Sequence, residues 1–196
     1  MSQNAITHVP TNFFVKDVFN NNLPENHEYE QFFWTTNVVD KLIKSFEYDF
    51  VDETCCLTTP SLAVGMNNQG RDEVLLDIDR RFNFLPKYKY YDVRTPYGLD
   101  NNFKLLVLDP PFFVIPIEEF RKAVDILTKN NYTTKLIIGF IKREEKRLIE
   151  AFKEYNLKPT NFELEYSSIK PNKWRNFCLY SNVDMPGIKR NMLYSK

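Results

Sequence analysis

The residues Asp109, Pro110, Pro111 and Phe112 stand where a buried strand is expected to end. The preceding run, residues 105–108, is apolar on both faces and too short for an isolated helix, which is typical of a buried parallel strand. Proline cannot donate a hydrogen bond to a β-ladder, so the two prolines must stop the strand at Asp109. In open α/β sheets, ligands bind at the carboxyl ends of the strands. The pattern therefore predicts a carboxylate, a proline carbonyl and an aromatic ring together at a binding edge.

These four residues resemble the Asp/Asn-Pro-Pro-aromatic motif of amino methyltransferases that use S-adenosylmethionine (SAM). The resemblance implies that the Asp109 carboxylate and the Pro110 carbonyl accept hydrogen bonds from the acceptor amine, while Phe112 stacks on the substrate. Such contacts suit an exocyclic adenine amine, because its lone pair is delocalised into the ring and must be localised and oriented. We therefore take Asp109, Pro110, Pro111 and Phe112 as candidate catalytic residues. The alternative is a turn that only ends the strand.

A second predicted strand, residues 73–79, ends in acid. An acid at the end of the second strand of a nucleotide-binding fold usually accepts hydrogen bonds from ribose hydroxyls. We predict Asp79 in this role because it is the terminal acid, whereas Asp77 lies further inside the strand. A surface ion pair of Asp79 with Arg80 or Arg81 is the alternative.

Three further positions are candidate cofactor contacts. Asp92, in a short predicted strand at residues 89–93, is placed for a contact near the cofactor's adenine, or it is a solvated acid. Thr59 and Pro60 form the turn after the first predicted strand, although a glycine-rich turn would be expected there and the chain has only 5 glycines. Trp34 precedes the first predicted helix and is either a core residue or a cofactor contact.

Strands alternate with helices along the chain, which predicts a doubly wound, mostly parallel α/β sheet with an antiparallel element at one edge. The strands are expected at residues 54–57, 73–79, 89–93, 105–108, 135–141, 161–166 and 176–182. Helices are expected where apolar residues recur with helical spacing, at 38–46, 117–127 and 148–155. We expect an irregular segment at residues 1–30 and one domain at residues 31–196.

Composition excludes several classes of protein. The 196 residues include 26 basic and 26 acidic side chains, which does not indicate a generally basic nucleic-acid binder. Three cysteines and two histidines without metal-ligand spacing predict no metal site and no disulfide framework. No apolar run approaches the ~20 residues that span a membrane, and no signal peptide is recognised. We expect a protein of the cytoplasm or the nucleus.

From Gln31 to about Ile188 the chain resembles the probable N6-adenine methyltransferase family. The matching elements are Gln31-Phe32-Phe33-Trp34, Thr58-Thr59-Pro60-Ser61, Asp79-Arg80-Arg81-Phe82, Tyr91-Asp92 and Asp109-Pro110-Pro111-Phe112. The family's own turn after the first strand is poor in glycine, so the missing glycines no longer argue against a cofactor site. The resemblance implies a Rossmann-like methyltransferase fold and SAM as cofactor.

Two branches of this family leave the acceptor open. The stretches 75–79 and 180–186 are closer to the branch that methylates adenine in ribosomal RNA, whereas the compact length resembles the branch that methylates lysine in a translation elongation factor. We favour RNA adenine and keep lysine as the alternative. A third possibility is a catalytically silent subunit that only binds a partner. We expect a monomer, or a complex with an unidentified partner.

A basic stretch near the carboxyl end is the candidate substrate surface. From Lys158 onward the chain has seven basic and three acidic residues, a net charge of +4. Lys170, Lys173 and Arg175 surround Trp174 in the loop between the last two predicted strands. Cations for phosphates and a ring for stacking are what single-stranded nucleic acid requires. The alternative is a solvated loop with Trp174 folded into the core.

Overall fold

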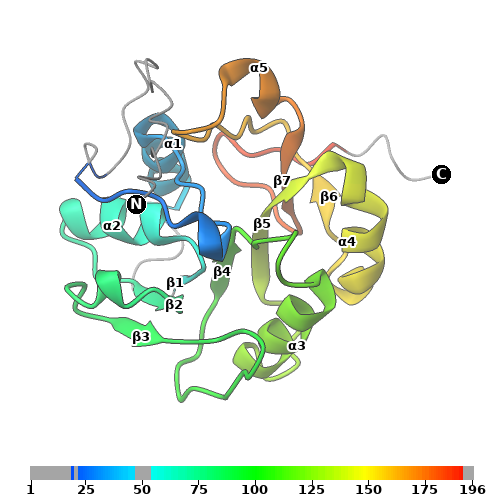
Figure 1. Cartoon of the computed structure of the whole chain (residues 1–196). Coiled ribbons are helices and arrows are strands. Elements are labelled where there is room, and N and C mark those ends of the chain that lie inside the picture. Colours follow the sequence, from blue (N-terminus) through cyan, green and yellow to red (C-terminus); the bar gives the residue numbers. More distant parts are fainter. Residues whose placement is uncertain (1–18, 20–21, 47–53, 192–196) are drawn as a thin grey trace, which may run out of the picture.

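A computed structural model describes residue 19 and residues 22–46 and 54–191. Seven strands form one sheet in the order β3-β2-β1-β4-β5-β7-β6 (Figure 1). They are β1 Thr54–Leu57, β2 Val74–Asp77, β3 Tyr88–Tyr90, β4 Leu105–Leu108, β5 Lys135–Ile141, β6 Lys158–Pro159 and β7 Phe177–Ser181. The strands β1 to β5 pair in parallel, and β7 is antiparallel to β5 and β6. The predicted α/β sheet with an antiparallel element is confirmed, although two-residue β6 lies outside β7.

Helices cover both faces of the sheet. Figure 1 shows α1 (Thr36–Phe46) and α2 (Pro60–Asn68) on one side, and α3 (Ile117–Leu127) and α4 (Glu145–Ala151) on the other. A short α5 (Pro171–Trp174) precedes β7. Four 3-10 turns complete the described elements, namely η1 His27–Tyr29, η2 Arg80–Phe82, η3 Lys142–Glu144 and η4 Lys153–Tyr155. The predicted helices 38–46 and 117–127 are confirmed. The third predicted helix, residues 148–155, corresponds to the last part of α4 followed by the 3-10 turn η4.

The central strand β4 shows why the sheet needs cover on both faces. Leu105 and Val107 join the core cluster that contains α1 and α2, whereas Leu106 and Leu108 join the cluster that contains α3 and α4. All four side chains are fully buried, and each such burial stabilises the fold by about 2 kcal/mol. Pro110 and Pro111 then end the strand, as predicted from the sequence.

The predicted strand at residues 161–166 is wrong. Phe162, Leu164 and Tyr166 are buried and alternate with more exposed residues, as the sequence pattern indicated. The segment nevertheless joins no ladder, and only Tyr166 forms an isolated bridge, with Trp34. Its buried side chains belong to the core cluster of α1 and α2, so the alternation reflects packing across that face of the sheet.

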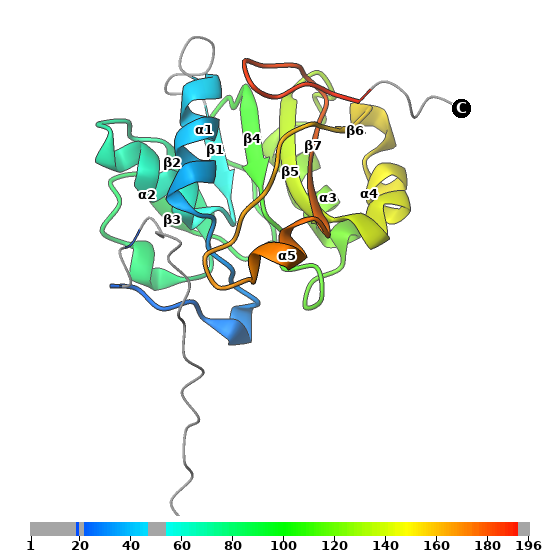
Figure 2. The same cartoon turned by 90° about the horizontal axis from the view of Figure 1, so that it is seen from above.

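Two strands of the other half end earlier than predicted. The ladder of β2 stops at Asp77, so Asp79 lies two residues beyond the strand and caps η2 by accepting the N–H of Arg81. The short edge strand β3 is residues 88–90, and Asp92 follows it in a loop. In Figure 2, η1, the loop after β4 and α5 lie at the same end of the sheet, where the parallel strands have their carboxyl ends.

Candidate active site

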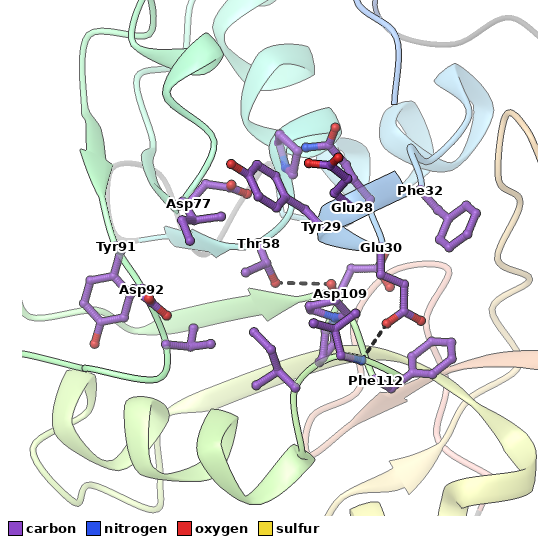
Figure 3. Close-up of a pocket in the computed structure, with 18 of the residues that line it drawn as sticks. Glu28, Tyr29, Glu30, Phe32, Thr58, Asp77, Tyr91, Asp92, Asp109 and Phe112 are labelled. Carbon is purple, nitrogen blue, oxygen red and sulfur yellow. Dashed lines mark hydrogen bonds between the residues drawn. The ribbon is translucent and has the colours of Figure 1, made fainter. Parts of the chain in front are cut away.

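A pocket of about 230 Å³ lies at the carboxyl ends of the parallel strands. Its walls come from the segment before α1 (residues 28–32), from the loops after β1 to β4, and from Tyr166 and Phe177. Figure 3 shows two ends of this pocket. Asp77, Tyr91 and Asp92 lie at the first end, Glu30, Phe32 and Phe112 lie at the second, and Thr58 and Asp109 lie between them.

Asp109 is positioned by contacts from three separate parts of the chain. The Tyr166 hydroxyl donates a hydrogen bond of 2.9 Å to Asp109 Oδ1. The Thr58 hydroxyl lies 3.2 Å from the backbone carbonyl of Asp109 and donates to it. Gly139 of β5 lies directly behind, since a Cβ at this position would come within 2.7 Å of Asp109 Oδ1 and 3.2 Å of the Trp34 ring. The carboxylate is therefore held in one orientation.

Asp109 is half-buried at the pocket, and its surroundings are poor in positive charge. Burial raises the pKa of its carboxyl well above the usual value, the hydrogen bond from Tyr166 opposes this shift, and the nearby Glu30 carboxyl adds to it. The indole of Trp34 is 1% exposed. Its N–H is buried without an acceptor of good geometry within the described part of the chain. The Trp34 side chain also opposes the rise in the pKa of Asp109, so the indole acts on the carboxylate from outside the pocket lining.

The aromatic residue of the motif lines the pocket and is braced from behind. Phe112 packs edge-on against Phe140 of β5 at 5.5 Å between ring centroids, and against Phe113 at 4.6 Å. The Phe177 ring lies 6.3 Å away. The N–H groups of Val114 and Ile115 donate to the Pro111 carbonyl, which closes the turn. One half-buried ring thus faces a cavity whose walls are largely apolar.

The acids at the first end of the pocket differ in their surroundings. Asp77 lines the pocket, and burial raises its pKa to about 7 despite a hydrogen bond from the Asp79 N–H. Asp79 does not line the pocket. Arg81 donates several hydrogen bonds to its carboxylate and Gln31 donates another, so its pKa is lowered although burial opposes this. Asp92 lines the pocket, and its pair with Arg94 lowers its pKa.

The turn after β1 supplies the floor between the two ends. Thr58 adopts a left-handed backbone with φ of 56°, where a glycine would be unstrained. Pro60 begins α2 and lines the pocket. Thr59 and Trp34 do not line it, and the Thr59 hydroxyl donates to the Val107 carbonyl. The turn therefore brings backbone to the pocket without glycine.

The predicted substrate residues lie outside the pocket. Lys170, Lys173 and Arg175 are exposed on α5 and beside it. The Trp174 indole N–H donates to the carbonyls of Tyr166 and Ile169, and the ring packs against the core cluster of α1 and α2. These contacts fit the alternative in which Trp174 belongs to the core.

Sequence reasoning missed three contributors to the pocket. The segment 28–32 was assigned largely to an irregular region, yet it roofs the pocket and is fixed by hydrogen bonds of Gln31 to Asp79 and Arg81. Tyr166 and Phe177 were assigned to strands without a role. An acid next to the matching Gln31-Phe32-Phe33-Trp34 element was the available signal for the segment. No local pattern indicated that Tyr166 reaches Asp109.

Within residues 19, 22–46 and 54–191, no three acidic, histidine or cysteine side chains are grouped to hold a metal ion. Nor does that part of the chain contain a helix long and apolar enough to cross a membrane. The pocket itself does fit a nucleoside cofactor. A buried acid ends β2, a loop acid follows β3, and the backbone approaches at the turn after β1, which is the arrangement that binds nucleotides in doubly wound sheets.

Comparisons with known proteins agree with this geometry. The fold is similar to the 16S rRNA methylase RmtB, with a TM-score of 0.50 and 12% identity over 80% of this chain, which spans 63% of that protein. It is equally similar to a TehB-like SAM-dependent methyltransferase from Corynebacterium glutamicum, with a TM-score of 0.50 and 12% identity over 78% of this chain and 88% of the other. No curated protein sequence matches the chain. The likeness establishes a Rossmann-like methyltransferase fold.

The sequence profile described as "Probable N6-adenine methyltransferase" matches residues 25–185, which is most of the chain. It covers both ends of the pocket and the motif at Asp109. SAM is the cofactor of methyltransferases with this fold and profile. The chain therefore belongs to the probable N6-adenine methyltransferase family and is a SAM-dependent methyltransferase.

Proposed function

We propose that this enzyme methylates the N6 amine of adenine in RNA. The observation that carries the proposal is that Asp109, Pro110 and Phe112 line one pocket together, with the cofactor-type acids Asp77 and Asp92 at its first end. An adenine ring can stack on Phe112 while its amine reaches the two oxygen acceptors. The same arrangement favours a planar base over a flexible chain, because a ring offers one large face for stacking.

In the proposed reaction the protein orients the amine and stabilises the charge that develops on it. Bound SAM supplies an activated methyl group on a sulfonium centre. The Asp109 carboxylate and the Pro110 carbonyl accept hydrogen bonds from the two N–H groups of the amine. These contacts turn the nitrogen lone pair out of conjugation with the adenine ring. Tyr166 and Gly139 fix Asp109, so little reorganisation is needed when the nitrogen becomes positive.

We assign the cofactor contacts by their place in the pocket. Asp77 would accept hydrogen bonds from the ribose hydroxyls, and Asp92 would contact the adenine side of the cofactor. Pro60 and Thr59 would bring the turn after β1 to the cofactor. Asp79 remains a predicted contact, but its carboxylate is engaged by Arg81. Trp34 would act from behind Asp109. The methyltransferase domain would be residues 31–196, with Lys170, Lys173 and Arg175 guiding RNA toward the pocket.

A lysine side chain is the second candidate acceptor, and one observation favours it. The acceptor end of the pocket contains the carboxyl groups of Asp109 and Glu30 between aromatic rings, and the only described cation in the lining is Arg94, which pairs with Asp92. Carboxylates and aromatic faces attract an ammonium group. A translation elongation factor would then be the substrate.

One experiment separates these acceptors. The purified full chain and methyl-labelled SAM are incubated in one reaction with total RNA and in a second reaction with total cell protein. The products are digested and identified by mass spectrometry. N6-methyladenosine in RNA is the expected product. Methyl-lysine without N6-methyladenosine would replace the RNA proposal by the lysine alternative.

A further inference from the structure

Glu30 lies at the acceptor end of the pocket, on the segment between η1 and α1. Its Oε2 accepts hydrogen bonds from the N–H groups of Phe113 at 2.7 Å and Val114 at 3.0 Å. Its backbone is left-handed, with φ of 51°, a conformation that costs a non-glycine residue of order 1 kcal/mol and persists where the surroundings impose it. The two backbone donors thus anchor Glu30 to the turn that follows the Asp-Pro-Pro-Phe motif.

The other carboxylate oxygen of Glu30, Oε1, accepts no hydrogen bond from the described residues. Oε1 is buried and has no hydrogen-bonding partner among residues 19, 22–46 and 54–191. A buried oxygen without a donor costs about 1–3 kcal/mol, and native structures keep few of them. Figure 3 shows the Glu30 side chain between Phe32 and Phe112 at the wall of the pocket. A donor brought by the substrate would remove this cost.

The Glu30 and Asp109 carboxyl groups are close enough to interact. Burial raises the pKa of Glu30, while its contacts with the Phe113 and Val114 N–H groups oppose the shift. Glu30 in turn adds to the rise in the pKa of Asp109. None of the ion pairs seen in the described residues involves either group. Two neighbouring acids without a cation favour a ligand that donates hydrogen bonds between them.

We propose that Glu30 is an acceptor-binding residue: its Oε1 shares with the Asp109 carboxylate one N–H of the methyl-accepting amine and takes the proton that this amine releases. The nitrogen lone pair forms the new bond to carbon, the carbon–sulfur bond breaks, and its electron pair stays on sulfur. The N–H proton passes to Oε1, and the electrons of that bond neutralise the nitrogen. The inference rests on the proposed methylation of nitrogen. With an adenine amine the proton leaves as the new bond forms, whereas a lysine ammonium group would have to give its proton to Oε1 before its lone pair could attack.

The test compares Glu30→Gln with Glu30→Ala. In Glu30→Gln the amide oxygen can still accept the Phe113 and Val114 N–H groups, while the amide nitrogen puts a donor where Oε1 was. Glu30→Ala also removes the anchor of the segment. Glu150→Gln is the matched control, because Glu150 is an exposed acid at the end of α4. The probes are adenosine monophosphate and N-acetyl-lysine amide, titrated by NMR into protein saturated with S-adenosylhomocysteine.

Glu30→Gln should weaken the probe that binds the wild type by at least about tenfold, because a hydrogen bond to a charged group is lost. The affinity for S-adenosylhomocysteine and the Glu150→Gln control should stay unchanged. Binding of the lysine probe alone would end the adenine proposal while supporting the role of Glu30. The inference is overturned if Glu30→Gln binds the probe as wild type does, if it loses S-adenosylhomocysteine as well, or if the wild-type complex binds neither probe.

Discussion

Acidic side chains lie near both ends of the pocket, but their partners and the directions of their pKa shifts differ. At the cofactor end, Asp92 in the lining and Asp79 outside it each pair with an arginine two residues later, and the pKa of each is lowered. At the acceptor end, burial raises the pKa of both Asp109 and Glu30, which have no described cationic partner. The difference separates acids that are paired with a cation within the described chain from acids that are not.

Asp77 is the informative exception at the cofactor end. It lies beside Asp79 in sequence, yet burial raises its pKa to about 7 and it faces the pocket. Like Glu30 it lines the pocket and is in none of the ion pairs of the described residues, although its carboxylate accepts the Asp79 N–H. Perturbed acids in a pocket are candidates for function, whereas acids paired with arginine are candidates for structure. This contrast orders the expected effects of mutation.

The largest effect is expected from Asp109→Ala. Removing the carboxylate that orients the amine should lower kcat/KM by about 30-fold or more, equivalent to roughly 2 kcal/mol of transition-state stabilisation. SAM affinity, measured by calorimetry, should stay within a factor of two or so. Tyr166→Phe, which removes only the hydrogen bond to Asp109 Oδ1, should have a smaller effect. Normal turnover of Asp109→Ala would remove this residue from the proposed mechanism.

The next effect tests the contrast between neighbouring acids. Asp77→Asn should weaken SAM binding by about tenfold or more, because an ionised carboxylate accepts ribose hydroxyls better than an amide does. Asp79→Asn should instead lower thermal stability, since it loses the Arg81 ion pair, and should change SAM affinity less. Calorimetry of both variants measures SAM affinity, and thermal unfolding measures the change in stability. The reverse order of affinities would return the ribose role to Asp79.

The pH dependence of cofactor binding follows from the same contrast. The raised pKa of about 7 means that Asp77 is mostly protonated at pH 6 and mostly ionised at pH 8. If the ionised form accepts the ribose hydroxyls, wild-type SAM affinity rises over this interval. In Asp77→Asn the rise should disappear. A rise that persists in the variant would assign the titration to another group.

A third, smaller effect is expected at Gly139. A methyl group there would lie 2.7 Å from Asp109 Oδ1, so Gly139→Ala should turn the carboxylate and lower kcat by several-fold to about tenfold. Gly98→Ala is the matched control, because its added methyl meets nothing closer than 3.9 Å. Unchanged kcat in Gly139→Ala, with a folded protein by circular dichroism, would mean that the orientation of Asp109 is not critical.

The sequence predicted the sheet better than its edges. Residues 105–108 and 136–141 carry no polar side chain and are buried, so burial on both faces decides their structure locally, and both predicted strands are confirmed. The segment 161–166 has the alternation of a strand, but whether it enters a ladder depends on which segments pair at the edge. Alternation records burial on one side and cannot supply that information.

The site was predictable where one strand end carries the chemistry, and less so where distant segments meet. The sequence led to Asp109, Pro110 and Phe112 because a buried strand followed by two prolines fixes their place at the sheet edge. It could not separate Asp77 from Asp79, since that depends on where the ladder of β2 stops. Tyr166 and Glu30 come from segments far from the motif, and only the folded chain brings them to Asp109.

The smallest effect is expected from the basic residues around α5, which lie outside the pocket and contact none of its acids. If RNA is the substrate, Lys170→Glu with Lys173→Glu should raise the apparent KM for RNA a few-fold and flatten its salt dependence, because fewer phosphate counterions are released on binding. SAM affinity should not change, since both lysines lie outside the pocket lining.

The matched control for this variant is Lys129→Glu with Lys153→Glu, which makes the same change of charge at exposed positions. Lys129 precedes β5 and Lys153 precedes β6, so both lie toward the amino-terminal edge of the sheet, away from the pocket. If both double variants change KM equally, only net charge matters, and the region around α5 is not an RNA surface. If the α5 variant alone loses salt dependence, phosphates pass over α5 on the way to Asp109. An unchanged titration in both would exclude the basic loop from substrate binding and would leave the carboxyl-lined acceptor end, with its preference for donors, to select the substrate.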